Sequence, residues 1–225
     1  CALPILIHCS ISGFGADGPL GGKPGYDAMG QAFCGLMAVN GTEESGPVRH
    51  GIPIVDIASG LNAIIGILLA LTERTRSGRG QHVEVTLFDT GLALPHPYAA
   101  MWFASDIAQG PVGNGHPDVA PYNKFVARDG DIFIGAPKDE QFRRLAQFLQ
   151  HPELADDPRF KTMHARVVNR PALEAVLAPL VAQFDREPLA AALMKAQVAA
   201  APNRSHGIMM DGTPTAAIRS SSSTR

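Results

Sequence analysis

Apolar residues recur with strand-like and helical spacing along the first half of the chain. The pattern predicts a buried strand over residues 3–12, a helix over 26–39 and a second strand over 82–89. Between the last two, a long helix begins near Asp56 and ends before Gly78, after a last turn rich in arginine. Its periodic apolar positions predict a buried stripe made of Leu61, Ile64, Ile65, Leu68 and Leu69.

The same pattern predicts how the helices pack and begin. The helix over 26–39 would place four apolar residues on one face, namely Met29, Phe33, Leu36 and Met37. Asp56 or Ser59 would cap the long helix through a side-chain oxygen, so we interpret Asp56 as a cap. Residues 15–25 hold five glycines and two prolines, which is typical of a loop close to the surface or to a ligand.

The composition and the hydrophobic pattern of the sequence change near residue 106. A stretch rich in glycine and proline leads into a hairpin that turns at Asp129-Gly130. Helical patterns follow over residues 138–150, 165–183 and 186–199. We therefore predict an α/β piece over residues 1–105, a small α+β domain over 106–203 and a poorly ordered or unnatural tail over 204–225.

Composition narrows the class of protein. About 45% hydrophobic and 18% charged residues fit a globular chain, and a net charge of −2 gives no reason to expect nucleic acid or an anionic membrane as partner. Three cysteines fit a reducing cytoplasm, and the first residues lack the pattern of a signal peptide. The apolar run Leu61–Leu71 is short for a bilayer span, so we expect a cytoplasmic protein with no membrane contact.

Two further expectations concern the start of the chain and its histidines. The chain opens without Met and enters an apolar run within two residues, so we expect that residues precede it in the natural protein. The eight histidines do not pair with cysteines or with one another at metal-ligand spacing, so we predict no metal site.

Several ordered blocks carry a family resemblance: SISGFGADGP, PGYDAMGQAFCGLMAVNG, GPVRHGIPIVDIASGLNAIIGILLAL, RSGRGQHVEVTLFD and NGHPDVAPYNKF. From about residue 3 to about residue 203, the sequence resembles the class III coenzyme A transferases. That superfamily includes formyl-CoA transferase, carnitine CoA-transferase and α-methylacyl-CoA racemase. The resemblance implies a doubly wound, Rossmann-like large domain, here partial, then the small domain, in an interlocked homodimer. It also implies that an N-terminal half with most of the CoA contacts is missing.

The resemblance implies a carboxylate nucleophile that attacks an acyl-CoA thioester and holds the acyl group as a mixed anhydride. The family uses an aspartate, and an ungapped alignment through the NG and GPVR blocks places Glu44 at that position. Glutamate keeps the functional group but adds one methylene, and a shift of one residue would select Glu43 instead. A pair of solvated loop charges is the structural alternative.

Asp27 is the candidate of the sister branch. The resemblance to α-methylacyl-CoA racemase implies a base here that moves the α-proton of a thioester. Racemases have a histidine before this aspartate, whereas this chain has Tyr26. The alternative is an acidic residue that interacts favourably with the dipole at the start of a helix.

Supporting residues follow from the same resemblance. Ser12, Gly13 and Phe14 end a strand where doubly wound folds place ligands, and Arg79 is a candidate for a CoA phosphate. The segment Gly113, Asn114, Gly115 and His116 matches the family's glycine-rich loop over the active carboxylate, with Tyr122 as a lining residue. Each has a structural alternative. Ser12–Phe14 would be a simple strand exit, Arg79 a solvated helix end, residues 113–115 a linker turn, and His116 a structural side chain.

Three hypotheses remain open at this point. The first is a CoA-transferase that takes an acyl-CoA and a small carboxylic acid and acts through Glu44. The second is a racemase that acts through Asp27, which deuterium incorporation at the α-carbon would test. The third is an inactive truncated chain or an interaction module, which tight CoA binding in calorimetry would refute.

Overall fold

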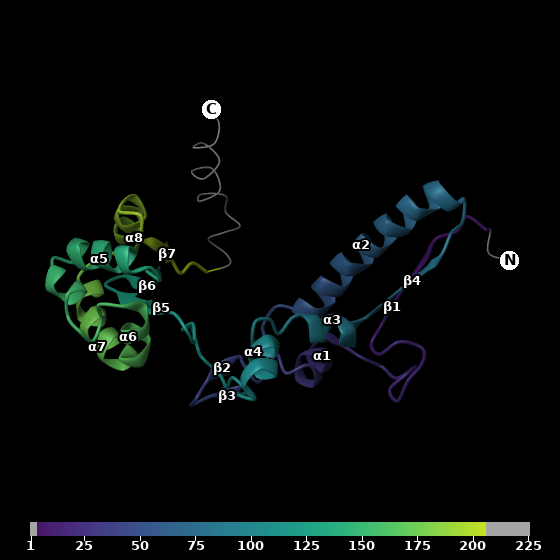
Figure 1. The fold of residues 1–225 in the computed structure, drawn as a ribbon, viewed down its shortest axis with the longest axis horizontal. Helices are drawn as coiled ribbons and strands as arrows, with labels where there is room; N and C mark the ends of the chain where they lie inside the picture. The colour runs from purple at the N-terminus through teal and green to yellow at the C-terminus, as the bar shows by residue number, and fades with distance from the viewer. Residues whose placement is uncertain (1–3, 206–225) are drawn as a thin grey trace, which may run out of the picture. The chain divides into compact units, whose positions relative to one another are not determined.

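The computed structural model describes residues 4–205. The chain divides into two compact units, Cys1–Gly113 and Asn114–Arg225, which are described one by one (Figure 1). The start of the strand predicted over residues 3–12, and most of the tail predicted over 204–225, lie outside the described residues. The mixed α/β class predicted from the sequence is confirmed.

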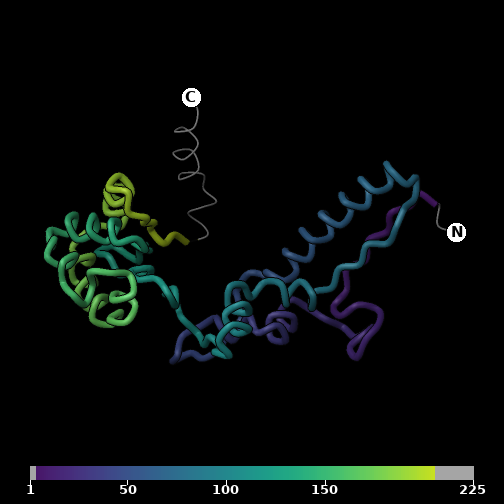
Figure 2. Tube along the Cα trace, viewed as in Figure 1, coloured from purple at the N-terminus to yellow at the C-terminus, as the bar shows by residue number. Residues whose placement is uncertain are grey.

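A parallel pair of strands forms the framework of unit 1. β1 (His8–Ser12) pairs with β4 (His82–Thr86), in register from His8 opposite His82 to Ser12 opposite Thr86. The strands lie side by side although about 70 residues separate them (Figure 2). Helix α2 (Ile54–Ser77) precedes β4 and packs against both strands.

Shorter elements complete unit 1. They are α1 (Asp27–Phe33), the small hairpin of β2 (Gly41–Thr42) and β3 (Gly46–Pro47), α3 (Leu87–Ala93) and α4 (Tyr98–Ser105). Helix α1 packs against α2 and α3. Residues 15–25 form the loop that their composition predicts.

Helix α1 is shorter than predicted, and it buries polar and small residues while its large apolar residues are exposed. It ends at Phe33, and its buried residues are Asp27, Gly30 and Gln31, whereas Met29 and Phe33 are exposed. The apolar face predicted for residues 26–39 is therefore wrong. Gly30 explains the orientation: a Cβ there would lie 3.1 Å from Cγ1 of Val55, so the missing side chain allows α1 to approach α2 closely.

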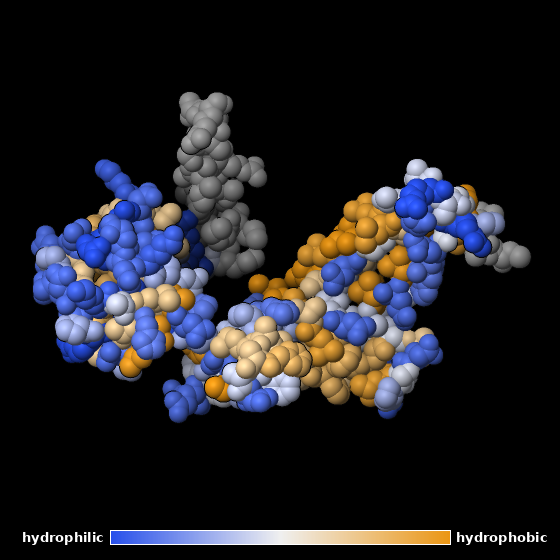
Figure 3. Space-filling view, viewed as in Figure 1, coloured by the Kyte–Doolittle hydropathy of each residue, from blue (hydrophilic) through white to orange (hydrophobic). Residues whose placement is uncertain are grey.

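Helix α2 also turns its large residues outward. The predicted buried stripe, Leu61 to Leu69, has exposed fractions between 54% and 65%, and the buried residues are Val55, Ser59, Ala63 and Ala70. Small residues face the strands because the backbones lie close together. A Cβ on Gly66 would lie 2.6 Å from Cγ1 of Val83. Figure 3 shows the resulting apolar surface along α2.

Helix α2 extends well beyond the apolar run that the sequence marks out. It has 24 residues, and only a small part of its long apolar stretch is buried. By length and composition this helix could cross a membrane, so the expectation of a run too short to span is wrong. Core helices of globular enzymes reach the same length and hydropathy. The predicted end at Gly78 is confirmed, with that residue in the left-handed region.

Unit 2 is a three-stranded antiparallel sheet covered by helices. The order is β5 (Tyr122–Ala127), β6 (Gly130–Gly135) and β7 (Ala199–Pro202). The predicted hairpin is confirmed, but its turn is formed by Arg128 and Asp129, one residue earlier than the predicted Asp129-Gly130. The helices are α5 (Asp139–Phe148), the 3₁₀ turn η1 (Pro152–Ala155), α6 (Met163–Val168), α7 (Arg170–Val181) and α8 (Arg186–Lys195). The helix predicted over 186–199 ends at Lys195, and β7 begins at its last predicted residue.

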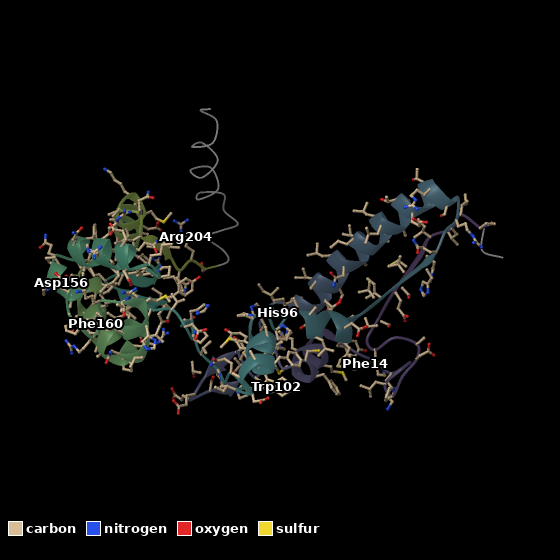
Figure 4. The ribbon with its side chains drawn as sticks, in the orientation of Figure 1. Phe14, His96, Trp102, Asp156, Phe160 and Arg204 are labelled. Atoms are coloured by element: carbon tan, nitrogen blue, oxygen red, sulfur yellow. The ribbon has the colours of Figure 1, made fainter. Side chains whose placement is uncertain are left out.

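The core of unit 2 is apolar and surrounds one charge. Phe142, Phe160 and Leu173 are among its fully buried side chains, and Figure 4 shows Phe160 among the helices. Arg166 is buried completely, and its guanidinium donates to the carbonyls of Ala120, Phe160 and Pro137. These bonds link α6 to three separate loops, and the Asp139 carboxylate lies 2.9 Å from the guanidinium and pairs with its charge.

Candidate functional site

The carboxyl ends of β1 and β4 mark the candidate site of unit 1. The two strands are parallel and end together, with Ser12 opposite Thr86. Because α2 runs back along the strands, its N-terminus lies at this same edge, beside α1 and α3 (Figure 1). Ligands of open α/β sheets bind outside the carboxyl ends of the strands. The residues at this edge are therefore the first candidates for chemistry.

The strand exit Ser12–Phe14 is tightly built. The Ser12 hydroxyl accepts a hydrogen bond from the amide of Gly15 at 2.9 Å. A Cβ on Gly13 would lie 2.6 Å from Cα of Gly25, so only glycine fits there. The Phe14 ring, labelled in Figure 4, packs edge-on against Phe33. The segment lies at the predicted edge, and its role in binding CoA stays a prediction.

Arg79 does not lie with these residues. It follows the C-terminus of α2, and the neighbouring Gly80 donates to the carbonyl of Pro4, ahead of β1. This is the amino end of the strands, about 17 Å from their carboxyl ends for strands of this length. The structure therefore does not bring Arg79 to the edge that holds Ser12.

Asp27 is engaged as the cap of another helix. Its Oδ1 atom accepts from the amide of Val55 at 2.8 Å and from that of Asp56 at 3.4 Å. Its Oδ2 atom accepts from Gln31 at 2.6 Å. Helix α2 has Pro53 at its N-cap position and no side-chain cap from it, so a residue of α1 satisfies its first amides. This geometry favours the structural interpretation of Asp27 over a proton-transferring base.

The capping roles predicted for Asp56 and Ser59 are wrong. Ser59 is buried inside α2, and its hydroxyl has no hydrogen-bond partner among the described residues. Asp56 lies in the first turn of α2, and its side chain is not needed as a cap because Asp27 supplies one. The Asp56 carboxylate is therefore available for chemistry at the carboxyl edge of the strands.

The electrostatics of Asp56 single it out further. Partial burial raises the pKa of the Asp56 carboxyl above its ordinary value, and the nearby Asp27 carboxylate raises it as well. Asp56 is itself solvent-exposed, so what distinguishes it is the neighbouring negative charge and its place in the first turn of α2. Carboxylates with perturbed pKa values cluster at functional sites. Sequence reasoning missed Asp56 because an acidic residue at a helix start is usually a cap.

Glu44 lies in a different setting. It belongs to the exposed turn between β2 and β3, together with Glu43. Reciprocal bonds between Thr42 and Ser45 hold this turn, at 2.9 Å and 3.1 Å. Both glutamates project from a hairpin tip, the setting of solvated loop charges, and the nucleophilic role of Glu44 stays a prediction.

The predicted glycine-rich loop is divided between the two units. Gly113 belongs to unit 1, has a φ of 61° and donates to the carbonyl of Gly41 at 2.7 Å, next to the hairpin that carries Glu44. Asn114 and Gly115 begin unit 2. Gly113 thus lies beside the hairpin, and closure of the loop over a reacting carboxylate stays a prediction.

His116 and Tyr122 lie together in unit 2. Their rings meet edge-on with centroids 5.8 Å apart, and the His116 amide donates to the carbonyl of Tyr122. Tyr122 also packs against Phe133 and lines a small pocket with Met194 and Gly135. A structural role is thereby explained for both, and substrate contact stays a prediction. Among residues 4–205, no three His, Cys, Asp or Glu side chains could jointly hold a metal ion.

Comparisons with known proteins agree with this architecture. The sequence model of CoA-transferase family III matches residues 2–221, so the chain is a member of that family of enzymes. A crystal structure of a CAIB/BAIF family protein from Brucella suis superposes with a TM-score of 0.82 at 38% identity, over 95% of this chain and 57% of that one.

Curated relatives name the chemistry of the family. Succinyl-CoA:glutarate CoA-transferase of Mus musculus is 36% identical over 180 residues, which are 80% of this chain and 41% of the relative. Acetyl-CoA:oxalate CoA-transferase of Acetobacter aceti is 39% identical over 175 residues, which are 77% of this chain and 45% of the relative. The chain therefore spans less than half the length of these two relatives.

Proposed function

We propose that the protein carrying this chain is an acyl-CoA:carboxylic acid CoA-transferase. The support is family membership, together with relatives whose names pair an acyl-CoA donor with a small acid such as glutarate or oxalate. The observation that carries the proposal is an available aspartate, Asp56, at the start of a long helix and at the ligand-binding edge of a parallel sheet. The homodimer and the cytoplasmic location stay predictions.

We infer that Asp56 is the nucleophile. The family resemblance implies an aspartate, and Asp56 satisfies this without the extra methylene of Glu44. The first turn of a helix also holds a carboxylate more rigidly than a hairpin tip, and reacting groups need placement within a fraction of an ångström. The positive end of the helix dipole favours the ionised form of a carboxylate in the first turn. Partial burial and the Asp27 carboxylate act in the other direction and raise the pKa of Asp56.

The proposed reaction proceeds through two anhydrides and one thioester. An Asp56 oxygen attacks the thioester carbon of the acyl-CoA, the C–S bond breaks, and CoA leaves as a thiolate. The thiolate attacks the Asp56 carbonyl carbon and releases the donor acid, which leaves CoA bound to Asp56. The acceptor carboxylate displaces CoA to form a second anhydride. CoA then attacks the acceptor acyl carbon and frees the Asp56 carboxylate.

Oxygen-18 in the acceptor acid tests which residue reacts. In the last step the bridging oxygen stays with the enzyme, so the reacting side chain gains one labelled atom from the acceptor. Trypsin cleaves after Arg49, which separates the peptide containing Glu44 from the peptide containing Asp56. We expect the label in the Asp56 peptide. Label in the other peptide would instead support Glu44.

Substitution gives an independent test. We expect Asp56→Asn to lower the transferase rate by about 10³-fold or more, the scale seen for loss of a nucleophile. Glu44→Gln, the matched control, should change it by less than about 10-fold, because a surface residue near a site affects mainly positioning. If Asp56→Asn retains the rate and Glu44→Gln loses it, the assignment to Asp56 is wrong.

A further inference from the structure

Two polar side chains of α1 are buried one helical turn apart. Asp27 is 8% exposed and Gln31 is 0% exposed, and the Gln31 amide donates to Oδ2 of Asp27 at 2.6 Å. Burying an amide and a carboxylate is costly unless every polar atom finds a partner. The partners of this pair therefore show what the pair does.

Gln31 holds the end of the segment that follows the hairpin. Its Oε1 atom accepts from the amide of His50 at 2.8 Å, and its Nε2 atom lies 3.5 Å from the carbonyl of the same residue. The amide of one glutamine thus holds the His50 backbone on both sides. The chain from Gly41 to His50 is fixed at its far end by α1.

Asp27 holds the start of α2. Its Oδ1 atom accepts from the amides of Val55 and Asp56, which have no acceptor within their own helix. Asp27 and Gln31 together fix both ends of the connection over residues 50–55. The connection is short, so its two anchors determine where the first turn of α2 begins.

We propose that Asp27 and Gln31 are positioning residues for acyl transfer, because their shared network sets where the Asp56 carboxylate lies. This inference rests on the proposed function of Asp56. It gives Asp27 a task that differs from proton transfer: the residue acts through the backbone of α2 and not on the substrate. The negative charge of Asp27 also contributes to the raised pKa of Asp56, after burial.

Two substitutions test the network. Each alone should break the hydrogen bond between positions 27 and 31, and the two combined should restore it. In Asp27→Asn, the new side-chain NH₂ faces the NH₂ group of Gln31, so one hydrogen bond is lost. In Gln31→Glu, a second carboxylate faces Asp27 in a buried site. In the double variant, the amide at position 27 donates to the carboxylate at position 31, which still accepts from His50. The acceptor for the Val55 amide is also kept.

The experiment measures kcat, KM for the acyl-CoA and amide hydrogen exchange at residues 50, 55 and 56. We expect each single variant to lower kcat by about 10²-fold, the scale of a misplacement by about an ångström, with KM changed less than threefold. The same amides should exchange faster. The double variant should recover kcat to within about tenfold of the parent and recover protection as well.

Glu73→Gln is the matched control, because it removes one negative charge from the far end of the same helix. It should leave kcat and protection unchanged. If both single variants keep kcat while Asp56→Asn is inactive, the positioning role is overturned and the nucleophile stands. If a single variant does not fold, the double variant decides. Restored protection without recovery of kcat also overturns the proposal.

Discussion

The two units solve the problem of burial in opposite ways. Among the described residues, unit 1 buries five hydrophobic residues and five polar or charged ones, whereas unit 2 buries twenty hydrophobic residues around Arg166 alone. Unit 2 therefore rests on an apolar core of its own. Unit 1 holds its elements together through small residues and a polar network, and it leaves most of the leucines and isoleucines of α2 exposed. This polar network of Asp27 and Gln31 contacts the backbone of Asp56, the candidate nucleophile, so the same residues hold unit 1 together and position the candidate site.

The largest expected effect tests the buried charge of unit 2. Burial lowers the pKa of the Arg166 guanidinium, and contact with Asp139 acts in the other direction. Arg166→Met would leave two buried carbonyls and one partly buried carbonyl without a donor, so we expect it to destabilise unit 2 by about 3–5 kcal/mol. Urea unfolding monitored by hydrogen exchange in peptides of this unit measures the loss. Arg159→Met, at an exposed arginine, should change stability by less than about 0.5 kcal/mol.

The next effect compares one leucine in each unit. Leu173 is fully buried in the core of unit 2, and Leu68 is 57% exposed on α2. We expect Leu173→Ala to cost about 2–5 kcal/mol. Leu68→Ala should cost no more than about 0.5 kcal/mol, because no core contact is lost. Equal costs, measured by unit-resolved hydrogen exchange, would show that the outer face of α2 is packed in solution.

Two glycines of α2 sharpen the comparison between its faces. A Cβ on Gly66 would lie 2.6 Å from Val83, whereas a Cβ on Gly60 would meet nothing within 4 Å. Gly66→Ala should therefore destabilise unit 1 by about 1–3 kcal/mol through overpacking. Gly60→Ala should stabilise it by about 0.5–1 kcal/mol through helix propensity. Thermal unfolding of the two variants checks the sign. Stabilisation by both would mean that α2 does not approach the sheet so closely.

The smallest effect concerns the dependence of stability on pH. The pKa of Asp56 is raised in the folded chain, so between its unfolded and folded pKa values the folded state binds more protons. The contribution of Asp56 to stability is therefore greatest at low pH and is lost as pH rises through the folded pKa. Asp56→Asn should stabilise the chain at pH 7 relative to the parent, and this gain should disappear below about pH 4. A gain that grows toward low pH would contradict the sign.

The sequence predicted the order of the elements better than their faces. The long helix ending at Gly78, the strand that follows it and the hairpin of β5 and β6 are confirmed, the hairpin with its turn one residue early, because glycine and alternating patterns act locally. The buried stripe of α2 was predicted wrongly, and the helix predicted over 26–39 ends at Phe33, before two of the residues assigned to its apolar face. Periodicity shows that a helix has an apolar face, but a close approach through Gly30 and Gly66 requires the small side to face inward.

The candidate site was predicted in part. Ser12, Gly13 and Phe14 lie at the carboxyl edge of the strands, as expected for a doubly wound fold. The capping of α2 by Asp27 could not be predicted, because the two amides that Asp27 accepts from, those of Val55 and Asp56, are 28 and 29 positions away along the chain. Without knowledge of these hydrogen bonds, the sequence favours Asp56 as the helix cap and leaves Asp27 as an unengaged carboxylate. The contact exchanges the two roles.

The sequence by itself determined the family, the α/β class and the succession of helices and strands. These depend on local spacing, on turn residues and on ordered blocks of similarity, which need no knowledge of what lies across the fold. Only the tertiary structure decided which side of each helix is buried and which carboxylate is available. Those outcomes depend on hydrogen bonds and backbone approaches between distant segments, and such contacts exist only once the chain has folded.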